Sequence, residues 1–258
     1  MAYQHLTIHK HAGIWTMTLN RPAVFNALHA PLIHEIREVA EAAKIADEVR
    51  VLVITGSGKA FCSGADLKAV VPAADVSHVL RSTYNPMILA LRSLDKPVIG
   101  AINGIAAGAG CSLALACDYL IAREDAVFAE LFSQIGLTLD AGSSAFLMQS
   151  VGYHKAFELA STARRFTAQE AFSFGLVAEV IAPVHWETRI QEVALEFASR
   201  PTRALGLIKQ ALQAADGKDL AHVLNLEAEG QLAASQTIDF QEGVAAFLQK
   251  RKPSFTGQ

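Results

Sequence analysis

The sequence predicts an α/β fold, and three observations carry that prediction. Residues 51–55 and 98–102 are short runs of apolar, largely β-branched residues, which are typical of buried strands. Residues 30–46 place apolar side chains every three or four positions, which is typical of a helix with one buried face. Further strand-like and helix-like segments follow in alternation, and that order favours helices layered on a sheet.

The first half of the chain begins with a predicted hairpin. Residues 3–9 and 13–19 alternate between apolar and polar side chains well enough to form two paired strands. After the strand at 51–55, a long helix is expected over residues 76–94. Pro86 would kink that helix, because proline lacks the backbone N–H that a helix requires.

The second half predicts more short elements and then a helical tail. Thr167 and Glu170 have the spacing of a capping box, which marks the start of a helix. From Trp186 to Lys250 the pattern is helical, with Pro201 marking a boundary. The elements in between are expected as strands at 119–122, 127–129 and 176–181 and as helices at 143–151, 153–162 and 167–174.

Composition excludes several classes of protein. A net charge of −3 over 258 residues gives no electrostatic basis for binding nucleic acid or an anionic membrane. No apolar run reaches the roughly 18 residues of a transmembrane helix, and the N-terminus lacks a signal-peptide pattern. Three cysteines without metal-ligand spacing are typical of reduced thiols, so we expect a cytoplasmic protein without a bound metal. A charged content of only 18% indicates surface buried between subunits.

The stretch from Lys96 to Tyr119 gives the first indication of function. The strand at 98–102 leads through a turn into residues 105–110, of which almost none is larger than alanine, and a helix follows from Ser112. Small residues let another group approach the backbone, and the first N–H groups of a helix have no partner inside it. Such N–H groups can stabilise negative charge that develops on an oxygen. Tight packing of the helix on the strand would explain the same small residues.

A second turn of this kind follows the strand at 51–55. Residues 56–67 again consist mainly of glycine and other small residues. Two strands that each lead into such a turn could direct one backbone N–H each toward the same oxygen. The pair of turns therefore favours a binding site over tight packing alone.

Motifs in these two turns resemble the crotonase (enoyl-CoA hydratase/isomerase) superfamily. They are Phe61-Cys-Ser-Gly-Ala-Asp-Leu67 and Asn103-Gly-Ile-Ala-Ala-Gly-Ala-Gly-Cys111, and segments 96–97, 116–118 and 166–177 extend the resemblance over nearly the whole chain. The resemblance implies a crotonase-type spiral of β-β-α units over residues 1–200, which would carry an acyl-CoA site. It also implies a C-terminal helical region, residues 201–258, that assembles the chain into a homotrimer or a dimer of trimers.

The resemblance also implies which residues bind the substrate. The backbone N–H groups of Ala65 and Ala109 would hold the thioester carbonyl of an acyl-CoA and stabilise its enolate. Ala109 stands where the family often has glycine, but a backbone contact does not depend on the side chain. Coenzyme A would be part of the substrate, with no separate cofactor. The other expected contacts are Phe25, Ala27, Ser63, Asp66, Leu67, Gly108, Phe132, Leu137 and, from the final helix of an adjacent subunit, Phe247 and Lys250.

The acid–base residues decide the reaction, and here the chain departs from the hydratases. Family hydratases use two glutamates to activate a water molecule, and the matching positions hold Ser112 and Phe132. Glu130 lies two residues upstream of the second position, which displaces it by about 7 Å along a strand. The sequence therefore disfavours ordinary hydration.

Asp140 stands where a different branch of the family keeps its catalytic carboxylate. Residues 135–142 resemble the corresponding segment of enoyl-CoA isomerases, and most closely of the 1,2-epoxyphenylacetyl-CoA isomerases of phenylacetate breakdown. A single carboxylate suits a proton shuttle that moves a double bond. An apolar pocket would raise its pKa and make it a better base. An aspartate just before a helix is otherwise a cap. The expected pocket lining is Phe132, Leu137 and Phe146.

Other functions remain open beside an isomerase. A hydratase with unusual acid–base residues is one, and a CoA-thioester-binding subunit without catalysis would explain the loss of both glutamates. Chlorobenzoyl-CoA dehalogenases also carry an aspartate at this position. They need a histidine in the helix before Lys96, where this chain has Tyr84-Asn-Pro-Met87, so that function is disfavoured.

Overall fold

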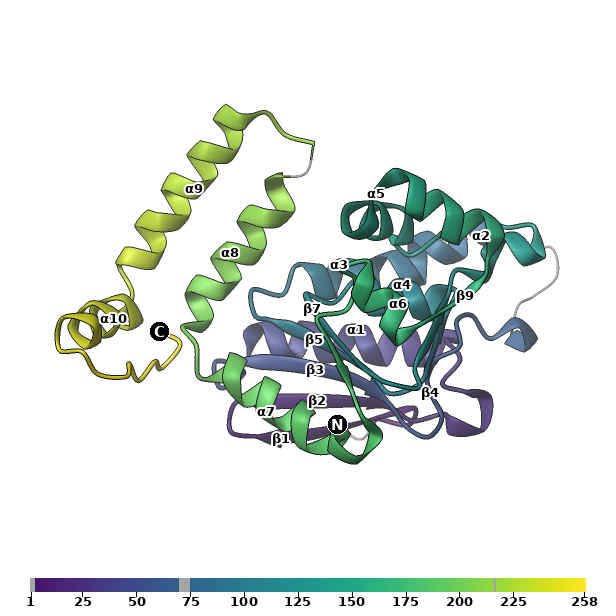
Figure 1. Ribbon diagram of the computed structural model, residues 1–258, viewed down its shortest axis with the longest axis horizontal. Coiled ribbons are helices and arrows are strands. Elements are labelled where there is room, and N and C mark those ends of the chain that lie inside the picture. The colour runs from purple at the N-terminus through teal and green to yellow at the C-terminus, as the bar shows by residue number, and fades with distance from the viewer. Residues whose placement is uncertain (1–2, 70–74, 216) are drawn as a thin grey trace.

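The computed structural model describes residues 3–69, 75–215 and 217–258, and it has the predicted α/β architecture (Figure 1). Its larger sheet is parallel except for the N-terminal hairpin, in which Leu6 pairs with Leu19. The six strands lie in the order β1 (Leu6–His11), β2 (Ile14–Leu19), β3 (Val51–Gly56), β5 (Val98–Ile102), β7 (Tyr119–Arg123) and β10 (Glu179–Ile181).

A second sheet, which the sequence did not predict as a whole, lies beside the first. Its strands are three residues long, too short for a periodic pattern to appear in the sequence. They lie in the order β4 (Ala60–Cys62), β6 (Ile105–Ala107), β8 (Val127–Ala129) and β9 (Arg165–Thr167). Each of β4, β6 and β8 continues the chain from β3, β5 or β7, so the two sheets are built from repeated β-β units with helices between them. This is the predicted spiral.

The long helix expected over 76–94 is divided into three parts. It consists of α2 (Val76–Val79), a π-helical turn (Leu80–Tyr84) and α3 (Asn85–Arg92). The N–H of Asn85 donates to the carbonyl of Leu80, five residues earlier. Because Pro86 lacks an N–H and its ring crowds the preceding turn, the helix widens before the proline rather than bending at it.

The remaining helices agree with the predicted segments apart from their ends. The capping box is present, since the Thr167 hydroxyl accepts the N–H of Glu170 and the glutamate reaches back to Thr167. Gly152, with φ +74°, interrupts α5 and divides it into the two predicted helices. The bounds are α1 (Ala30–Ile45), α4 (Ala109–Leu115), α5 (Ser143–Thr162), α6 (Ala168–Ser173) and α7 (Trp186–Ala198), with 3₁₀ turns at Pro22–Val24, Leu67–Ala69, Leu131–Ile135 and Pro183–His185.

Two hydrophobic clusters cover the two faces of the larger sheet. One contains the buried faces of α1, α3 and α4 with Leu52 and Ile54 of β3, and the other places Trp186 and Ile190 of α7 against Val51 and Val53. Since alternate residues of a strand point to opposite faces, β3 supplies both clusters. No helix within the described residues is long and apolar enough to span a membrane.

The tail forms α8 (Thr202–Ala215), α9 (Leu220–Ser235) and α10 (Ile238–Leu248), which extend from one side of the body (Figure 1). Helix α8 is held to the body by the buried Lys209, which pairs with Asp118 at 2.8 Å and donates to the carbonyl of Leu91 at 3.2 Å. Large apolar side chains on α9 and α10, including Leu224, Leu232 and Phe247, are exposed in the single chain.

Candidate active site

The turn after β4 leaves Ala65 exposed. Gly64, with φ +94°, permits the turn, and the N–H of Leu28 donates to the Gly64 carbonyl at 2.7 Å. The N–H of Asp66 donates back to the Leu28 carbonyl at 2.8 Å. These two bonds hold the residues on either side of Ala65, whose own N–H has no hydrogen-bond partner among the described residues. This donor is therefore fixed in direction and free to bind a ligand.

The start of α4 offers a second free donor. The N–H of Gly108 donates to the carbonyl of Ala129 in β8 at 2.8 Å, and the first bond inside the helix runs from Ser112 N–H to the Gly108 carbonyl at 3.0 Å. Ala109 lies between them, and its N–H finds no acceptor in the part of the chain that the structure describes. The helix begins three residues earlier than the sequence predicted, at Ala109 instead of Ser112.

The two turns lie in direct contact, as the sequence predicted from their small residues. A Cβ added to Gly64 would lie 2.7 Å from the carbonyl oxygen of Ala107 and 3.4 Å from the nitrogen of Ala109. A Cβ added to Gly110 would lie 2.2 Å from the carbonyl oxygen of Cys62. Glycine at 64 and 110 is therefore required for β4 and α4 to approach each other, and the approach brings the two free N–H groups together.

Asp140 is half-buried in the loop before α5, and its side chain does not cap the helix. The N-cap is Gly142, and no side chain caps that end. One carboxylate oxygen, Oδ1, is buried without a hydrogen-bond partner among the described residues. Burial raises the pKa of Asp140 from 3.8 to about 6, because a charged carboxylate loses solvation there. No donor in the described part of the protein occupies this oxygen, so it is available to accept a proton from a ligand.

Tyr84 is a site residue that the sequence analysis did not select. Burial raises the pKa of its phenol, and the negative charge of Asp140 raises it further, with smaller effects from Cys62 and Asp66. The ring therefore lies within electrostatic range of both the base and the turn around Ala65. Its only sequence indication was its place in the helix where dehalogenases need a histidine. The π-helical turn that ends at Tyr84 is a form often found at functional sites.

Neither hydratase position provides a carboxylate. Ser112 is fully buried in α4, with its hydroxyl 3.4 Å from the Gly108 carbonyl, and Phe132 is buried in the 3₁₀ turn after β8. Glu130 is fully buried, and its Oε1 accepts the Ser143 hydroxyl at 2.7 Å. Glu130 is thus engaged inside the protein.

Comparison with known proteins agrees with this geometry. The family described as enoyl-CoA hydratase/isomerase matches residues 9–258. The chain belongs to the enoyl-CoA hydratase/isomerase family. It is 40% identical to a probable enoyl-CoA hydratase of Rhodobacter capsulatus, over the whole of both chains. It is 38% identical to the 1,2-epoxyphenylacetyl-CoA isomerase of Escherichia coli, over 97% of each chain. An enoyl-CoA hydratase subunit of Geobacillus kaustophilus has the same fold, with a TM-score of 0.94, 32% identity and 99% of each chain covered.

Five of the residues expected to bind coenzyme A lie in or beside the Ala65 turn, and Arg21 joins them. The Ser63 N–H donates to the Phe25 carbonyl at 3.0 Å, and Leu28, next to Ala27, pairs with Ala65. The side chain of Asp66 is bonded to Arg21 at 3.0 Å, and this guanidinium lowers the pKa of Asp66. Arg21 also donates to the Ala27 carbonyl. Asp66 therefore braces the turn with its side chain, while Phe25 and Leu67 are exposed.

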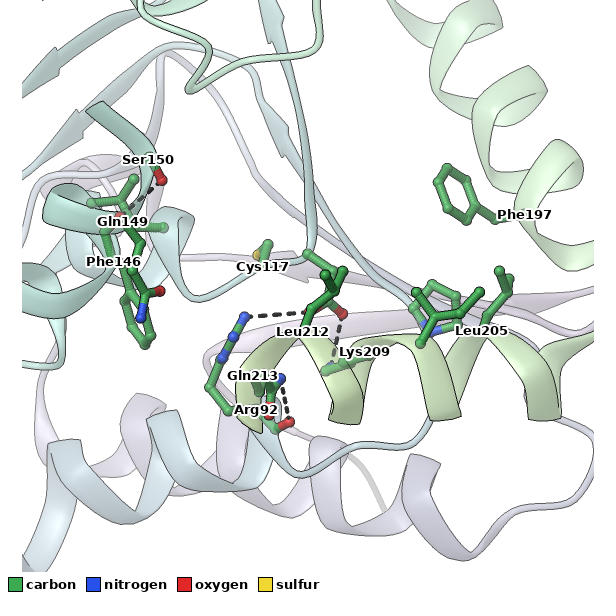
Figure 2. Close-up of a pocket in the computed structure, with 14 residues that line it drawn as sticks. Arg92, Cys117, Phe146, Gln149, Ser150, Phe197, Leu205, Lys209, Leu212 and Gln213 are labelled. Atoms are coloured by element: carbon green, nitrogen blue, oxygen red, sulfur yellow. Dashed lines mark hydrogen bonds and ion pairs between the residues drawn. The ribbon is translucent and has the colours of Figure 1, made fainter. Parts of the chain in front are cut away.

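Leu137 lies in the loop before Asp140 and is 48% exposed, whereas Phe132, also expected in this pocket, is buried. The Phe146 ring contacts the Arg92 guanidinium, with 5.1 Å between the ring centre and the guanidinium carbon. It lines a different cavity, of about 520 Å³, between α5 and α8 (Figure 2). Leu115 and Cys117, at the far end of α4, also line that cavity, which contains neither Ala65 nor Asp140. The expectation that Phe146 helps to desolvate Asp140 stays a prediction, since its ring lies against Gly142, two residues along the chain from Asp140.

The two residues expected from the end of the chain lie far from the site within one subunit. Phe247 is 83% exposed near the end of α10, and Lys250 follows with φ +52°. Figure 1 shows α10 at the opposite end of the molecule from α2 and α5. Their expected contact with coenzyme A therefore requires a second subunit. No group of three or more potential metal ligands occurs within the described ranges.

Proposed function

We propose that this protein is an enoyl-CoA isomerase that moves a double bond along an acyl-CoA thioester without a separate cofactor. The observation that carries the proposal is Asp140, a half-buried carboxyl group with an unpartnered oxygen, in a chain that has Ser112 and Phe132 at the two hydratase positions. A single carboxyl group can remove one proton and return it, which is the whole of an isomerisation.

The two free N–H groups supply the other half of the chemistry. The thioester carbonyl would lie between Ala65 N–H and Ala109 N–H, and removal of a proton next to it would place negative charge on its oxygen. Each such donor typically lowers the barrier by about 3 kcal/mol. The donors are already fixed by the Leu28 and Gly108 hydrogen bonds, so little reorganisation is needed as the charge develops.

The raised pKa of Asp140 suits a base that must also give the proton back. With a pKa of about 6, the group is mostly ionised at neutral pH, yet it binds a proton more strongly than an ordinary carboxylate. Asp140 would therefore take a proton from one carbon of the bound enolisable chain and deliver it to another. The same group would assist the opening of an epoxide ring, which makes a 1,2-epoxyphenylacetyl-CoA-type substrate the finer proposal.

Hydration is the second candidate, because the probable hydratase of Rhodobacter capsulatus is similar over the whole chain. Hydration needs one group to activate water and another to supply a proton. Asp140 is the one half-buried carboxyl group proposed here to contact the substrate, and Glu130 is bonded to Ser143 in the interior. We therefore expect hydration to be much slower than isomerisation.

The test is to supply the purified protein with a panel of acyl-CoA thioesters and identify the products. A 3-enoyl-CoA should be converted to the conjugated 2-enoyl-CoA, and the ultraviolet absorbance of the conjugated thioester measures this conversion. Crotonyl-CoA should be hydrated slowly. Rapid hydration at equal enzyme concentration would favour the second candidate. Binding of thioesters without any turnover would favour a binding subunit.

A further inference from the structure

Glu130 is a buried ionisable side chain that the proposed proton shuttle does not use. It follows β8 directly and has no exposed surface. Its Oε1 accepts the hydroxyl of Ser143 at 2.7 Å, while its Oε2 is buried without a hydrogen-bond partner in the described part of the chain. An unpaired charge in such a place is costly, so the position favours an uncharged carboxyl group.

This carboxyl group lies between the two halves of the candidate site. On one side is α4, where the thiol of Cys111 lies beside the carboxyl group and the N–H of Gly108 is bonded to Ala129, the neighbour of Glu130. On the other side is the loop that carries the base, where the N–H of Ser143 donates to the carbonyl of Asp140 at 3.0 Å. Glu130 therefore connects the helix that starts with Ala109 to the segment that carries Asp140.

We propose that Glu130 is a positioning residue for Asp140, and that its uncharged carboxyl group, through Ser143, holds the Asp140 loop against α4. The inference rests on the proposed function, since it assigns a role in the same proton transfer. Glu130 itself touches neither the substrate nor the transferred proton.

The protonation of the two carboxyl groups agrees with this division of roles. Burial raises the pKa of Glu130, the Ser143 hydroxyl and the Cys111 thiol partly offset this, and the charge of Asp140 adds a smaller increase. Together they bring the pKa from 4.5 to about 7. Asp140, at about 6, loses its proton first. Between these two values the form with a charged Asp140 and a neutral Glu130 predominates. Because the two carboxyl groups interact, the two observed proton losses are properties of the coupled pair.

Loss of the second proton should disturb the site. Above pH 7 the Glu130 carboxylate would be a fully buried charge close to a second carboxylate, with no cation beside it among the groups named above. Water would then enter to solvate that charge, or the loop that carries Asp140 would move away from it. We therefore expect turnover to rise as Asp140 ionises and to fall again as Glu130 ionises, which gives a bell-shaped pH profile.

The first experiment compares the pH profile of kcat for the isomerisation of a 3-enoyl-CoA in the wild type and in E130Q. Glutamine still accepts the Ser143 hydroxyl but cannot ionise. The expected result is that the alkaline fall disappears while the acid limb remains. An unchanged alkaline fall in E130Q would overturn the proposal.

The second experiment removes the bridge itself. S143A should lower kcat on the order of tenfold with little change in KM, because the loop that carries the base is no longer held in place. S150A is the matched control, since the Ser150 hydroxyl donates to the Phe146 carbonyl of its own helix, at 2.8 Å, and not to another segment among the described residues. A wild-type kcat in S143A would overturn the positioning role. Failure of the proposed function is separate: it would appear as full turnover in D140N, whatever E130Q and S143A do.

Discussion

The two halves of the candidate site are built from different groups: one from the backbone and the other from side chains. The half around Ala65 and Ala109 consists of backbone N–H groups, held by Gly64, Gly110 and the hydrogen bonds of Leu28. The half around Asp140 consists of side chains, with Glu130 and Ser143 behind them. A backbone donor survives a change of side chain, whereas a proton shuttle does not.

This difference separates what the family shares from what an individual member does. Under the proposed function, the backbone half would bind any thioester carbonyl and stabilise an enolate, which is compatible with relatives named hydratase and with relatives named isomerase. The side-chain half decides where the proton goes. The predictions that follow test the two halves separately.

The largest effect is expected from the side-chain half. D140N replaces the base with an amide of the same shape, so isomerase turnover should fall by about 10²- to 10⁴-fold while acyl-CoA affinity stays close to that of the wild type. Steady-state kinetics and calorimetric titration with a non-reactive saturated acyl-CoA measure the two quantities. Near wild-type turnover in D140N would remove Asp140 from the mechanism.

The next effect is expected from the backbone half. G64A places a Cβ 2.7 Å from the Ala107 carbonyl at a residue with φ +94°, so the turn must move and misdirect the Ala65 N–H. Turnover should fall on the order of 10²-fold, comparable to the loss of one oxyanion donor. G175A is the control, because Gly175 also has positive φ but open space around its Cβ. Equal losses in both variants would mean that backbone strain alone is responsible.

The sequence predicted the backbone half better than the side-chain half. The small residues of both turns and the capping box of Thr167 act within a few residues of chain, so their pattern is visible in the sequence. The motif residues outside the turns proved structural. The ammonium group of Lys96 binds the Ala43 and Ala46 carbonyls at the end of α1, and Asp118 accepts the Val98 N–H at 2.9 Å.

What the sequence could not predict depends on contacts between distant segments. Strand β4 forms only because it pairs with β6, and β9 forms only because it pairs with β8. Strands of three residues have too few positions for a period to be recognised. Tyr84 approaches Asp140, and Arg21 pairs with Asp66, across 56 and 45 residues of sequence (140 − 84 and 66 − 21). The bond between Glu130 and Ser143 is likewise tertiary. From the sequence, Glu130 could be described only as lying two residues before the position of the second hydratase glutamate.

A third prediction concerns the loss of folding stability that the buried, ionised Asp140 causes. The pKa of Asp140 is raised in the folded protein, so the folded state binds its proton more tightly than the unfolded state does. Stability therefore falls as pH rises from about 4 through about 6 and stays lower above that. D140N lacks this penalty. Its melting temperature should exceed that of the wild type by a few degrees above pH 6, with little difference below pH 4.

Melting curves measured across this pH range, without substrate, decide the point. The N–H groups of the backbone half do not titrate, and Asp66 beside them has a lowered pKa, so the loss of stability in G64A should not change over the pH range in which Asp140 ionises. A D140N difference that does not vary with pH would mean that the carboxyl group is solvated in the folded protein, which would weaken its assignment as a desolvated base.

The smallest effect is expected from the C-terminal end of the chain, which would complete the site of an adjacent subunit. We propose that the chain assembles as a trimer-based oligomer, because α9 has no buried residue in the single chain and exposes Leu224 and Leu232. Assembly would bury this surface and bring Phe247 and Lys250 of one subunit to the coenzyme A of the next. Light scattering should therefore give a multiple of three chains, and a monomer would contradict the assembly.

Lys250 tests the shared site without disturbing the assembly. Lys250 has no salt bridge or side-chain hydrogen bond within the described residues and follows the end of α10, so K250A should leave the oligomer intact. An ammonium group facing a phosphate of coenzyme A at the surface is worth about 1 kcal/mol or less, so acyl-CoA affinity should fall only a few-fold, and less at high salt. K252A is the matched control from the same tail. If K250A and K252A bind a saturated acyl-CoA equally well at low salt, Lys250 is a solvated surface cation and each site is completed within one subunit.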